Sequence, residues 1–548
     1  MLAAPAPTPD IPAPTIEYGL LSPMLLVFGI AVVGVLVEAF VPRAHRAAVQ
    51  MPITLLGLAG AFILTIVVAT QDITPASGQG WGKLAAMGSI GIDRPTLFIQ
   101  GTILILALVS TFMIAERRTD EGSFTAQAAA TPGSAAEREG LLAGATHTEV
   151  YPLVMFAVGG MLLFPASGDL ITMFVALEVL SLPLYLLCGL ARRRRLLSQE
   201  AAVKYFLLGA FSSGFFLFGA ALLYGYAGSV QLGAIARAVR LGPGGQYATE
   251  VYGASGQFAQ VTVGSNALLM LGVALLAVGL LFKLGAVPFQ SWKPDVYQGA
   301  PTPITALMAS CTLVAAFGAL FRVFYVAFDG LTWEWRPMMW LIAILTMVVG
   351  AVVAVTQTDV KRLLAYSSIA HAGFILTGMI AADAAGLSSA LFYLAAYGFT
   401  TIGAFAIVTL VRDAGGEAGH LSRWAGLGKR SPVIAGAFAF FLLAFAGIPL
   451  TSGFIGKFAV FQAAIAGGAT PLVVVGVLSS AVAAFFYVRI IVLMFFSDPA
   501  PDGPAVVVPS VFTSAAVALG VAATLVLGVL PQSVLDLADQ AASSLFVR

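Results

Sequence analysis

Apolar segments about 20 residues long recur along this chain, and they constrain its fold more than any other feature. A helix of that length crosses the hydrocarbon core of a bilayer, which is roughly 30 Å thick. Lipid offers the backbone no hydrogen-bond partners, so such segments cross a membrane as α-helices. Of the 548 residues, 59% are hydrophobic and only 10% are charged, which excludes a soluble globular protein. The sequence therefore predicts an all-α, polytopic membrane protein.

The apolar segments predict about fourteen transmembrane helices by this length criterion. Three of them precede a polar loop predicted for residues 116–149, and the others follow it. The expected spans, in chain order, are Leu20–Phe40, Pro52–Ala69, Thr96–Ala115, Tyr151–Pro165, Leu170–Leu190, Tyr205–Ala227, Asn266–Phe289, Thr302–Ala327, Pro337–Thr356, Leu363–Ala382, Leu387–Val411, Pro432–Phe461, Pro471–Phe496 and Val508–Leu530. The twelfth span is long and is expected to be broken.

The segment Phe282–Pro288 places a lysine within an apolar run and follows it at once with a glycine and a proline. An ionisable side chain at bilayer depth costs roughly 2.5–3.5 kcal/mol, so Lys283 is a candidate functional residue. Proline removes a helix hydrogen bond, and Gly285 and Pro288 are therefore expected to break the helix beside the lysine. Broken helices at membrane depth line protein or a water-filled cavity, which makes this segment a candidate part of an ion path.

Two weak internal similarities predict a repeat. Lys204–Gly214 resembles Leu391–Gly403, and the break beside Lys283 is echoed by Ala446–Pro449, with Lys457 shortly after it. Spans four to eight would then match spans nine to thirteen, and the second copy would be inverted because each copy has an odd number of helices. Two inverted five-helix repeats, each with a broken helix, are typical of transporter cores. The expected divisions are an N-terminal three-helix segment (1–115), a polar loop (116–149), the first repeat (150–330), the second repeat (331–497) and a C-terminal helix (498–548).

Further ionisable residues within the apolar segments are candidates for proton transfer. Glu178 lies in mid-span and Lys204 begins the next span, so the two could meet as an ion pair. A nearby lysine stabilises a charged glutamate, and moving it away would raise the proton affinity of that carboxylate, as a pump requires. Lys457 belongs to the second broken helix, and His371 is the only histidine in an apolar segment. Structural alternatives stay open, because a lysine near a helix end can snorkel to the interface and a histidine can serve packing alone.

Lysine and arginine gather in the loops that follow odd-numbered spans. Arg43 and Arg46 follow the first span, Arg192–Arg195 follow the fifth, and Lys361 and Arg362 follow the ninth. Such residues concentrate in cytoplasmic loops, so both termini are expected on the non-cytoplasmic side. The N-terminal residues lack the basic start of a secretory signal peptide, and none is expected.

The sequence contains no motif for a redox or nucleotide cofactor. Cys188 and Cys311 lie in apolar segments and are expected to serve packing, since two thiols cannot form an iron–sulfur or zinc cluster. There is no glycine-rich phosphate loop with its lysine. We expect neither a metal nor a cofactor on this chain, and a net charge of +1 spread over short loops gives no reason to expect nucleic acid.

With these residues in view, the chain resembles the antiporter-like membrane subunits of the proton-pumping NADH–quinone oxidoreductase, respiratory complex I. The resembling stretches cover spans four to twelve and are Ala176–Tyr185, Glu200–Ala210, Phe282–Pro303, Asp359–His371 and Ala446–Lys457. The order Leu-Ser-Leu-Pro-Leu-Tyr after the mid-span glutamate, and a lysine in the second broken helix, favour the subunit N branch over its siblings.

The resemblance implies that Glu178 and Lys204 are paired residues of spans five and six, that Lys283 is the central lysine, and that Lys457 is the outlet. It also implies proton movement driven by electron transfer from NADH to quinone in other subunits. NADH, FMN, iron–sulfur clusters and quinone would then belong to those partner subunits. The implied partners of this chain are the other membrane subunits, including the antiporter-like siblings, within the lipid bilayer of a bacterial-type inner (plasma) membrane.

Span eight departs from the family pattern. The family carries a bridging lysine there, but Leu313 stands at the matching position within Ala309–Phe317. Leucine cannot carry a proton, so either water held by Ser310, Thr312 or His371 bridges the gap, or this chain pumps poorly or differently. Two alternatives to a complex I pump stay open. One is a subunit of a multi-subunit cation/proton antiporter, which shares the fold and needs no electron donor, and the other is a non-pumping scaffold of the membrane arm.

Overall fold

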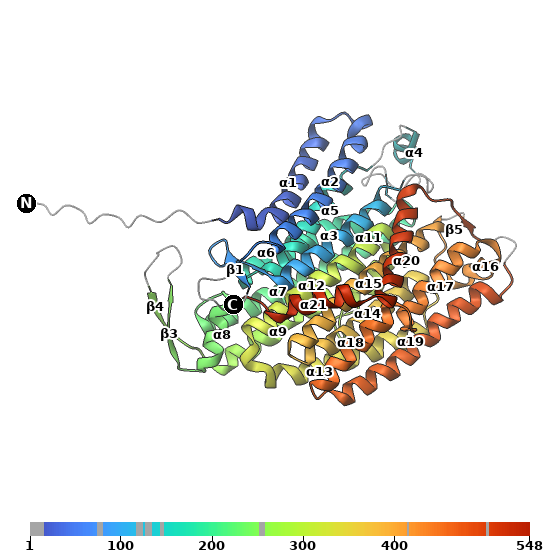
Figure 1. Ribbon diagram of the computed structural model, residues 1–548. Helices are drawn as coiled ribbons and strands as arrows, with labels where there is room; N and C mark the ends of the chain where they lie inside the picture. Colours follow the sequence, from blue (N-terminus) through green and yellow to red (C-terminus); the bar gives the residue numbers. More distant parts are fainter. Residues whose placement is uncertain are drawn as a thin grey trace, which may run out of the picture.

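The computed structural model describes residues 16–73, 81–116, 124–125, 134–142, 147–250, 258–413, 416–499 and 503–547. The described residues are mostly helical, as the sequence predicts (Figure 1). Residues 1–15 and most of the polar loop predicted for residues 116–149 lie outside the described residues.

Twelve helices of the described residues are long and apolar enough to cross a membrane. They are α1 (Tyr18–Phe40), α2 (Arg43–Ala69), α3 (Arg94–Ile114), α6 (Leu170–Cys188), α7 (Arg195–Ala227), α9 (Asn266–Leu284), the helix Thr302–Ala327, α13 (Thr332–Val355), α14 (Val360–Ile380), α15 (Ala384–Leu410), α19 (Thr470–Phe496) and α20 (Val511–Val529). Three further apolar helices are shorter, namely α5 (Val150–Ala166), α17 (Pro432–Ala446) and α18 (Ser452–Ala466).

Every apolar segment expected from the sequence overlaps one of these helices, but several ends differ. α7 begins at Arg195 rather than at Tyr205, and α2 begins at Arg43 rather than at Pro52. In both cases the helix continues through polar residues beyond the apolar run, because hydropathy marks contact with lipid and not the end of backbone hydrogen bonding. The seventh segment ends as a helix at Leu284, earlier than expected, because the chain breaks there.

The helix Thr302–Ala327 contains two π-helical turns, one within it and one at its C-terminal end. It consists of α11 (Thr302–Leu307), η1 (Met308–Thr312), α12 (Leu313–Arg322) and η2 (Val323–Ala327). Such π-helical turns are rare and are found frequently at functional sites. The first of them ends immediately before Leu313, the position at which the sequence departs from the family pattern.

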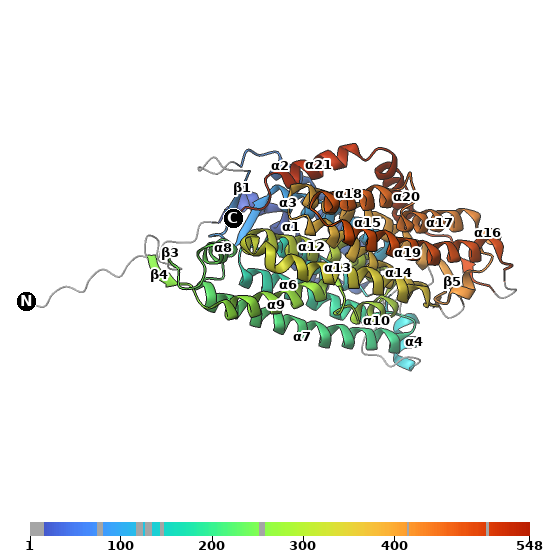
Figure 2. The ribbon, with the colours of Figure 1, turned by 90° about the horizontal axis from the view of Figure 1, so that it is seen from below.

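The remaining helices are short. They are α4 (Ala135–Leu142), α8 (Leu232–Leu241), α10 (Trp292–Gly299), α16 (Leu427–Arg430), α21 (Gln532–Ser543) and the 3-10 turns η3 (Asp329–Leu331) and η4 (Leu421–Trp424). The C-terminal region, for which the sequence predicts one helix, thus contains both α20 and α21. α21 is too polar to be a span and lies along the outside of the bundle against α15 (Figures 1 and 2).

Small antiparallel sheets lie at the two ends of the bundle (Figures 1 and 2). β1 (Gly82–Ala85) pairs with β2 (Ile90–Asp93), and β3 (Gln246–Glu250) pairs with β4 (Phe258–Thr262). At the opposite end, β5 (Val411–Asp413) pairs with both β6 (Gly416–Glu417) and β7 (Ala505–Val506).

Both ends of the described chain lie at the end of the bundle that carries β1 and β2. Glu17, just before α1, pairs with Lys83 of β1 at 2.8 Å. The backbone N–H of Val547 donates to the carboxylate of Asp93 at 3.0 Å. The fold therefore brings residues 17 and 547 to the same side.

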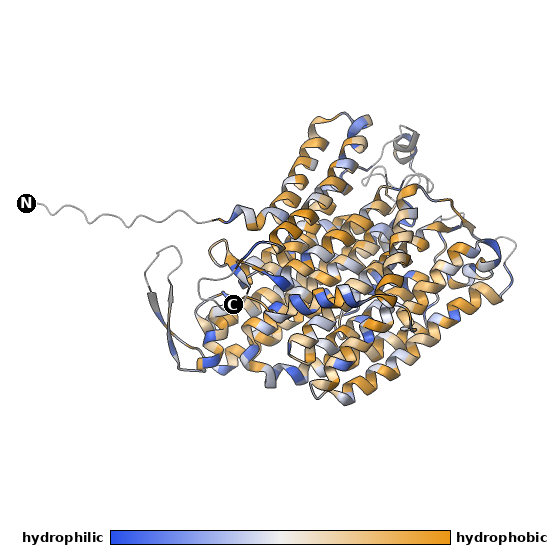
Figure 3. Cartoon of the chain, in the orientation of Figure 1, coloured by the Kyte–Doolittle hydropathy of each residue, from blue (hydrophilic) through white to orange (hydrophobic). Residues whose placement is uncertain are grey.

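The centre of the bundle is formed by helices that other helices surround. In the most apolar part of the Thr302–Ala327 helix, α14 and α15, 100%, 94% and 94% of the residues are buried, against 33% in α20. Hydrophobic residues cover the bundle, whereas hydrophilic residues gather at its ends and on α21 (Figure 3). Polar side chains on the central helices are thus enclosed by protein and not by lipid, which is where intramembrane ionisable groups are expected.

Candidate functional site

The first broken helix, α9, ends at Leu284, and Gly285 follows it in the left-handed region with φ 70°. The N–H of Gly285 donates to the carbonyl of Phe282 at 2.9 Å, and the N–H of Ala286 donates to that of Leu281 at 3.0 Å. This is the Schellman pattern that ends helices, and glycine favours it because it carries no Cβ. The break predicted beside Lys283 is therefore present, and the chain becomes helical again in α10.

The second broken helix ends in the same way. α17 ends at Ala446, and Gly447 follows with φ 85°. The N–H of Gly447 donates to Ala444 at 3.0 Å, and the N–H of Ile448 donates to Leu443 at 3.1 Å. The twelfth span is thus divided into α17 and α18, as its length predicts.

Lys283 is buried among aromatic rings in the last turn of α9. Its ammonium lies 5.6 Å from the ring centre of Tyr185 and 5.1 Å from that of Tyr205, and 3.5 Å from the Tyr205 hydroxyl. The Tyr205 ring in turn stacks on Trp292 at 4.7 Å. Cation–π contacts of this kind stabilise a lysine charge away from water without holding its protons as a carboxylate would.

Glu178 faces this lysine from α6. It lies two turns before Tyr185, whose ring Lys283 approaches, and one of its carboxylate oxygens is buried without a hydrogen-bond partner. The hydroxyl of Tyr185, on the same helix, is also buried without a partner. Polar atoms left in this way are ones to which water can bind.

Lys204 does not pair with Glu178, which corrects the expectation of a direct ion pair. Its ammonium lies 2.6 Å from Glu200, one turn earlier on α7, and 2.8 Å from Asp295 on α10. Arg362 of α14 contacts the same Asp295 carboxylate at 2.6 Å. The lysine turns towards α10 because two carboxylates lie there, and Glu178 remains available to interact with Lys283.

His371 lies at the centre of the molecule, on α14. One ring nitrogen is 2.8 Å from the hydroxyl of Tyr393, and the other is 3.4 Å from that of Tyr487. The rings of Tyr397 and Phe445 pack against it, with centroid distances of 4.8 and 5.5 Å. A buried imidazole between two hydroxyls can pass a proton from one nitrogen to the other, which is the chemistry expected of a relay.

Lys457 caps the C-terminal end of α17, the first half of the second broken helix. From α18, its ammonium donates to the carbonyls of Phe445 (2.9 Å) and Ala446 (3.0 Å) and to the hydroxyl of Ser480 (2.8 Å). Lys283, by contrast, lies before its break and donates to no carbonyl of α9. Lys283 and Lys457 therefore do not occupy equivalent positions in the two broken helices.

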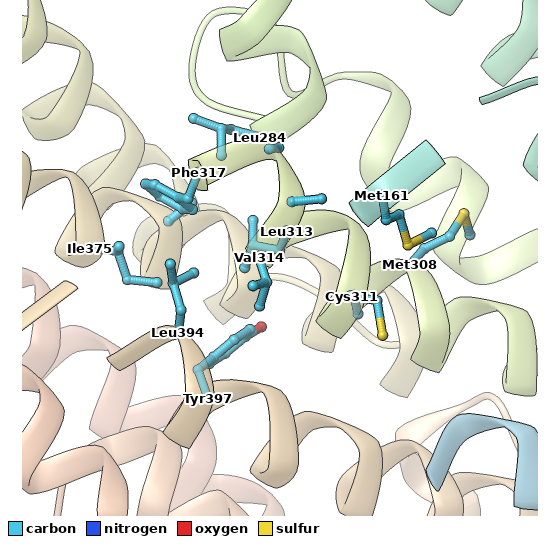
Figure 4. Close-up of a cluster of buried hydrophobic side chains, with 14 of the residues drawn as sticks. Met161, Leu284, Met308, Cys311, Leu313, Val314, Phe317, Ile375, Leu394 and Tyr397 are labelled. Atoms are coloured by element: carbon cyan, nitrogen blue, oxygen red, sulfur yellow. The ribbon is translucent and has the colours of Figure 1, made fainter. Parts of the chain in front are cut away.

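Leu313 lies in a tightly packed apolar cluster. Leu284, Val314 and Phe317 surround it, and the Tyr397 ring lies at the edge of the cluster (Figure 4). The hydroxyl of the nearby Ser310 is bonded to helix carbonyls, whereas that of Thr312 is buried without a partner. The Ser310 hydroxyl can therefore still accept a hydrogen bond from water, and the Thr312 hydroxyl can both donate and accept one.

Sequence reasoning missed the burial of Lys293 in α10. Only 1% of this residue is exposed, and its ammonium donates to the carbonyl of Leu284 at 3.0 Å. The available signal was its position shortly after the first break, which parallels the position of Lys457 after the second. Lys293 lies in a polar stretch beside a tryptophan and a proline, which is the pattern of a lysine at the membrane interface. The sequence does not give the direction of its side chain, so its burial could not be predicted.

The described residues contain no group of three or more histidine, cysteine, aspartate or glutamate side chains that could hold a metal ion. Cys188 and Cys311 are free and buried. Cys188 approaches the sulfur of Met308 at 3.7 Å, so this thiol serves packing, as its apolar surroundings predict.

A family of membrane proteins, described as NADH:quinone oxidoreductase/Mrp antiporter, TM, matches residues 167–483. The chain belongs to this family. The matched residues contain both broken helices, the central helices and all five ionisable residues singled out from the sequence. They end before α20 and α21, which lie outside this shared part.

Curated relatives place the chain within one branch of the NADH:quinone oxidoreductase/Mrp family. "NADH-quinone oxidoreductase subunit N" of Rhodococcus opacus is 62% identical over 98% of this chain and 98% of its own length. The protein of that name from Thermobifida fusca is also 62% identical, over 97% of this chain and 93% of its own.

Solved structures of the family share the fold. A chain of respiratory complex I from Thermus thermophilus is 32% identical, with a TM-score of 0.70, covering 94% of this chain and 98% of that one. A chain of the Mrp complex from Dietzia sp. superposes with a TM-score of 0.74 over 96% of this chain and 97% of its own. At 21% identity, the second likeness shows the fold alone.

Proposed function

We propose that this chain is the proton-translocating subunit N of a bacterial NADH–quinone oxidoreductase. The relatives that bear this name are 62% identical over nearly the whole chain. The observation that carries the function is a row of ionisable side chains on α6, α9, α14 and α18: Glu178, Lys283, His371 and Lys457. The last three are buried within the apolar bundle, and Glu178 is partly buried, with one carboxylate oxygen enclosed. Such groups are costly inside a membrane and are kept where ions or protons move.

In the proposed mechanism, protons move through this row while electrons pass from NADH to quinone in partner subunits. NADH, FMN, iron–sulfur clusters and quinone would be bound by those partners. A change of charge near Glu178 alters the proton affinity of Lys283. A change in the charge of Lys283 then alters the proton affinity of the next ionisable residue in the row. Each step is a coupling free energy between neighbouring sites. Lys204 acts on Glu178 indirectly, because its ammonium is held by Asp295.

The row runs through two units that we propose to be inverted five-helix repeats. The first comprises α5, α6, α7, the broken helix α9–α10 and the helix Thr302–Ala327, within residues 150–330. The second comprises α13, α14, α15, the broken helix α17–α18 and α19, within residues 331–497. The identical pattern of hydrogen bonds at Gly285 and Gly447 supports this pairing. Residues 1–115, the loop 116–149 and residues 498–548 would then be additions to the repeats.

We further propose that both termini lie on the non-cytoplasmic side of the bacterial inner membrane. The charges at the end of the bundle that carries β5 support this orientation. There Arg194 donates to the backbone of Glu417 at 3.1 Å, and Arg423 pairs with Asp413 at 2.9 Å. Basic residues concentrate on the cytoplasmic side of membrane proteins.

Proton pumping by the assembled complex tests this function. Protons moved per NADH oxidised are measured in membrane vesicles at matched complex content, for the natural chain and for Lys283→Ala. Lys429→Gln is the control, because Lys429 pairs with Asp498 at the exposed end of the bundle and lies outside the row. We expect a lower ratio for Lys283→Ala and an unchanged ratio for Lys429→Gln.

A non-pumping scaffold of the membrane arm is the second candidate, and the apolar surroundings of Leu313 favour it. It predicts that Lys283→Ala moves as many protons per NADH oxidised as the unsubstituted chain, and that outcome would contradict the proposed function. A subunit of a cation/proton antiporter would instead exchange sodium for protons in vesicles without NADH.

A further inference from the structure

Any proton that passes from Lys283 to His371 must go around Leu313. The Leu313 side chain is 2% exposed and is packed among Leu284, Val314 and Phe317 (Figure 4). Apolar cavities and contacts of this kind stay dry, so a chain of water molecules through this cluster is unfavourable. A route therefore needs another group that can bind a proton, located beside the cluster.

Lys293 is such a group. It is 1% exposed, and no carboxylate of the described residues lies within ion-pair distance of its ammonium. Asp295, two positions along α10, is already shared by Lys204 and Arg362. A buried ammonium without a counter-charge costs several kcal/mol, and the cost falls when the amine releases its proton. This environment suits a lysine that alternates between its charged and neutral forms.

On one side, Lys293 adjoins the turn that carries Lys283. Its ammonium is 3.0 Å from the carbonyl oxygen of Leu284, the residue immediately after Lys283. The neighbouring Trp292 donates to the carbonyl of Phe282 at 2.9 Å and stacks on Tyr205, whose hydroxyl is 3.5 Å from Lys283. The two lysines thus lie on opposite sides of the same break.

On the other side, Lys293 faces the helix that carries His371. Its ammonium lies 5.7 Å from the ring centre of Tyr297. The Tyr297 hydroxyl lies near that of Ser368, and the Ser368 hydroxyl is buried without a hydrogen-bond partner. Ser368 is one turn before His371 on α14, and α10, which carries Lys293, packs directly against α14.

The two breaks place Lys293 and Lys457 alike. Lys293 donates to the last carbonyl of α9, that of Leu284, and Lys457 donates to the last carbonyl of α17, that of Ala446. Both distances are 3.0 Å, and both lysine stems pass the left-handed glycine of their break. In the first broken helix the equivalent of Lys457 is therefore Lys293 and not Lys283.

From these contacts we infer that Lys293 is the proton carrier between Lys283 and His371, supplying in α10 the link that Leu313 cannot provide. An N–H bond of the Lys283 ammonium breaks as one forms on the neutral Lys293 amine, with the Tyr205 hydroxyl beside Lys283 and water as the proposed carriers between them. Lys293 then releases its proton towards the Tyr297–Ser368 side and His371. Charge and protons balance within the row, so no further reactant is required. The inference rests on the proposed function.

A purely structural role for Lys293 would be to cap the open end of α9, and two substitutions separate this role from proton transfer. Lys293→Gln keeps an N–H donor for the Leu284 carbonyl but cannot take up a proton. Lys293→Arg keeps donors and a positive charge but does not release its proton in a protein. A cap tolerates both changes, whereas a proton carrier tolerates neither.

The test measures protons moved per NADH oxidised in vesicles at matched content of the whole complex. We expect Lys293→Gln and Lys293→Arg to lower the ratio to that of Lys283→Ala, with Lys429→Gln unchanged. Natural pumping by either Lys293 variant would overturn the inference while a lowered ratio in Lys283→Ala still supports the proposed function. A natural ratio in Lys283→Ala would instead remove the proposed function itself.

A second variant tests the link to position 313 directly. Leu313→Lys restores a lysine on the Thr302–Ala327 helix, and we expect it to raise the ratio in the Lys293→Gln background. Leu313→Lys alone shows whether the apolar cluster accepts the new side chain. If that single variant assembles and pumps normally but does not raise the ratio of Lys293→Gln, Lys293 does not substitute for the missing lysine, and the inference is overturned.

Discussion

Lys204 and Asp295 form an ion pair of 2.8 Å that joins α7 to α10. Arg362 of α14 binds the other oxygen of the same carboxylate at 2.6 Å, so Asp295 connects three helices. α10 is also the half-helix that carries Lys293. α10 therefore connects Lys204 to the break between Lys283 and Lys293, without a direct contact between Lys204 and Glu178.

The first prediction concerns this junction. Asp295→Asn leaves Lys204 and Arg362 facing each other without their shared carboxylate, so we expect fewer protons per NADH. The pair is partly exposed, and its loss should cost no more than about 1 kcal/mol of stability. The complex should therefore assemble, and vesicle pumping is the measurement. Glu200→Gln is the matched control, because it removes the other carboxylate of Lys204 and leaves the junction with α10 intact.

A natural ratio in Asp295→Asn would show that the junction is not part of the coupling. Equal losses in Asp295→Asn and Glu200→Gln would indicate that only the charge of Lys204 matters, and not its contact with α10.

The second prediction concerns the glycine of the first break. Gly285 has φ 70°, and a Cβ there would approach the Lys293 Cδ to 2.6 Å. Gly285→Ala should cost about 1–2 kcal/mol for the left-handed backbone and should also displace Lys293. We expect a lower melting temperature of the purified complex and weaker pumping. Gly436→Ala in α17 is the control, because a Cβ there meets nothing within 4 Å. Unchanged pumping by Gly285→Ala would show that the position of Lys293 is not critical.

The third prediction separates the two kinds of contact made by Lys457. Lys457→Met removes an ammonium donor from the buried carbonyls of Phe445 and Ala446. The Phe445 carbonyl then costs about 1–3 kcal/mol, whereas the Ala446 carbonyl keeps the Ser480 hydroxyl as a donor at 3.5 Å. Ser480→Ala removes one hydroxyl contact of 2.8 Å, worth about 1 kcal/mol. We expect Lys457→Met to lower both pumping and the melting temperature, and Ser480→Ala to keep most pumping. Similar pumping in the two variants would argue against proton transfer through Lys457.

The sequence predicts the membrane-crossing fold and both breaks well, because these depend on local composition. An apolar run must become a helix in lipid, and Gly285 and Gly447 end their helices by backbone conformation alone. The partner of Lys204 was not predictable in the same way. Asp295 is distant in sequence and reaches Lys204 only because the chain returns along α10 after the break.

The burial of Lys293 could not be predicted from the sequence either. Its neighbours Trp292, Pro294 and Asp295 give it the local pattern of a membrane interface. Its burial arises because the break leaves the Leu284 carbonyl open and because Gly285 leaves room for the lysine stem. The direction of a side chain thus depends on tertiary contacts, and hydropathy does not report them. The amphipathic α21 escaped prediction for a related reason, since it is too polar to be recognised as a span.

The fourth prediction concerns Arg322, a fully buried arginine at the end of α12 that belongs to the stability of the fold and not to the proton row. Its guanidinium lies 2.7 Å from the carboxylate of Asp93, and the two side chains are 1% and 0% exposed. It also donates to the hydroxyl of Thr96 and the carbonyl of Pro165, both at 2.5 Å. The backbone N–H of Val547 binds the same Asp93 carboxylate, so the pair holds the C-terminal residues against α3.

Removing one partner of this pair leaves the other charge buried and unpaired, which costs about 3–5 kcal/mol. We expect Asp93→Asn and Arg322→Met each to reduce the amount of assembled complex in the membrane, as measured by the content of its partner subunits. The double variant leaves neither charge buried, so it should lose less than the sum of the two single losses. The complex that does assemble in Asp93→Asn should move the natural number of protons per NADH, since the pair lies at the β1–β2 end and outside the row. Full assembly of either single variant would contradict the stabilising role of the pair. If Asp93→Asn moved fewer protons per NADH at matched complex content, the proton row would extend to this end of the bundle.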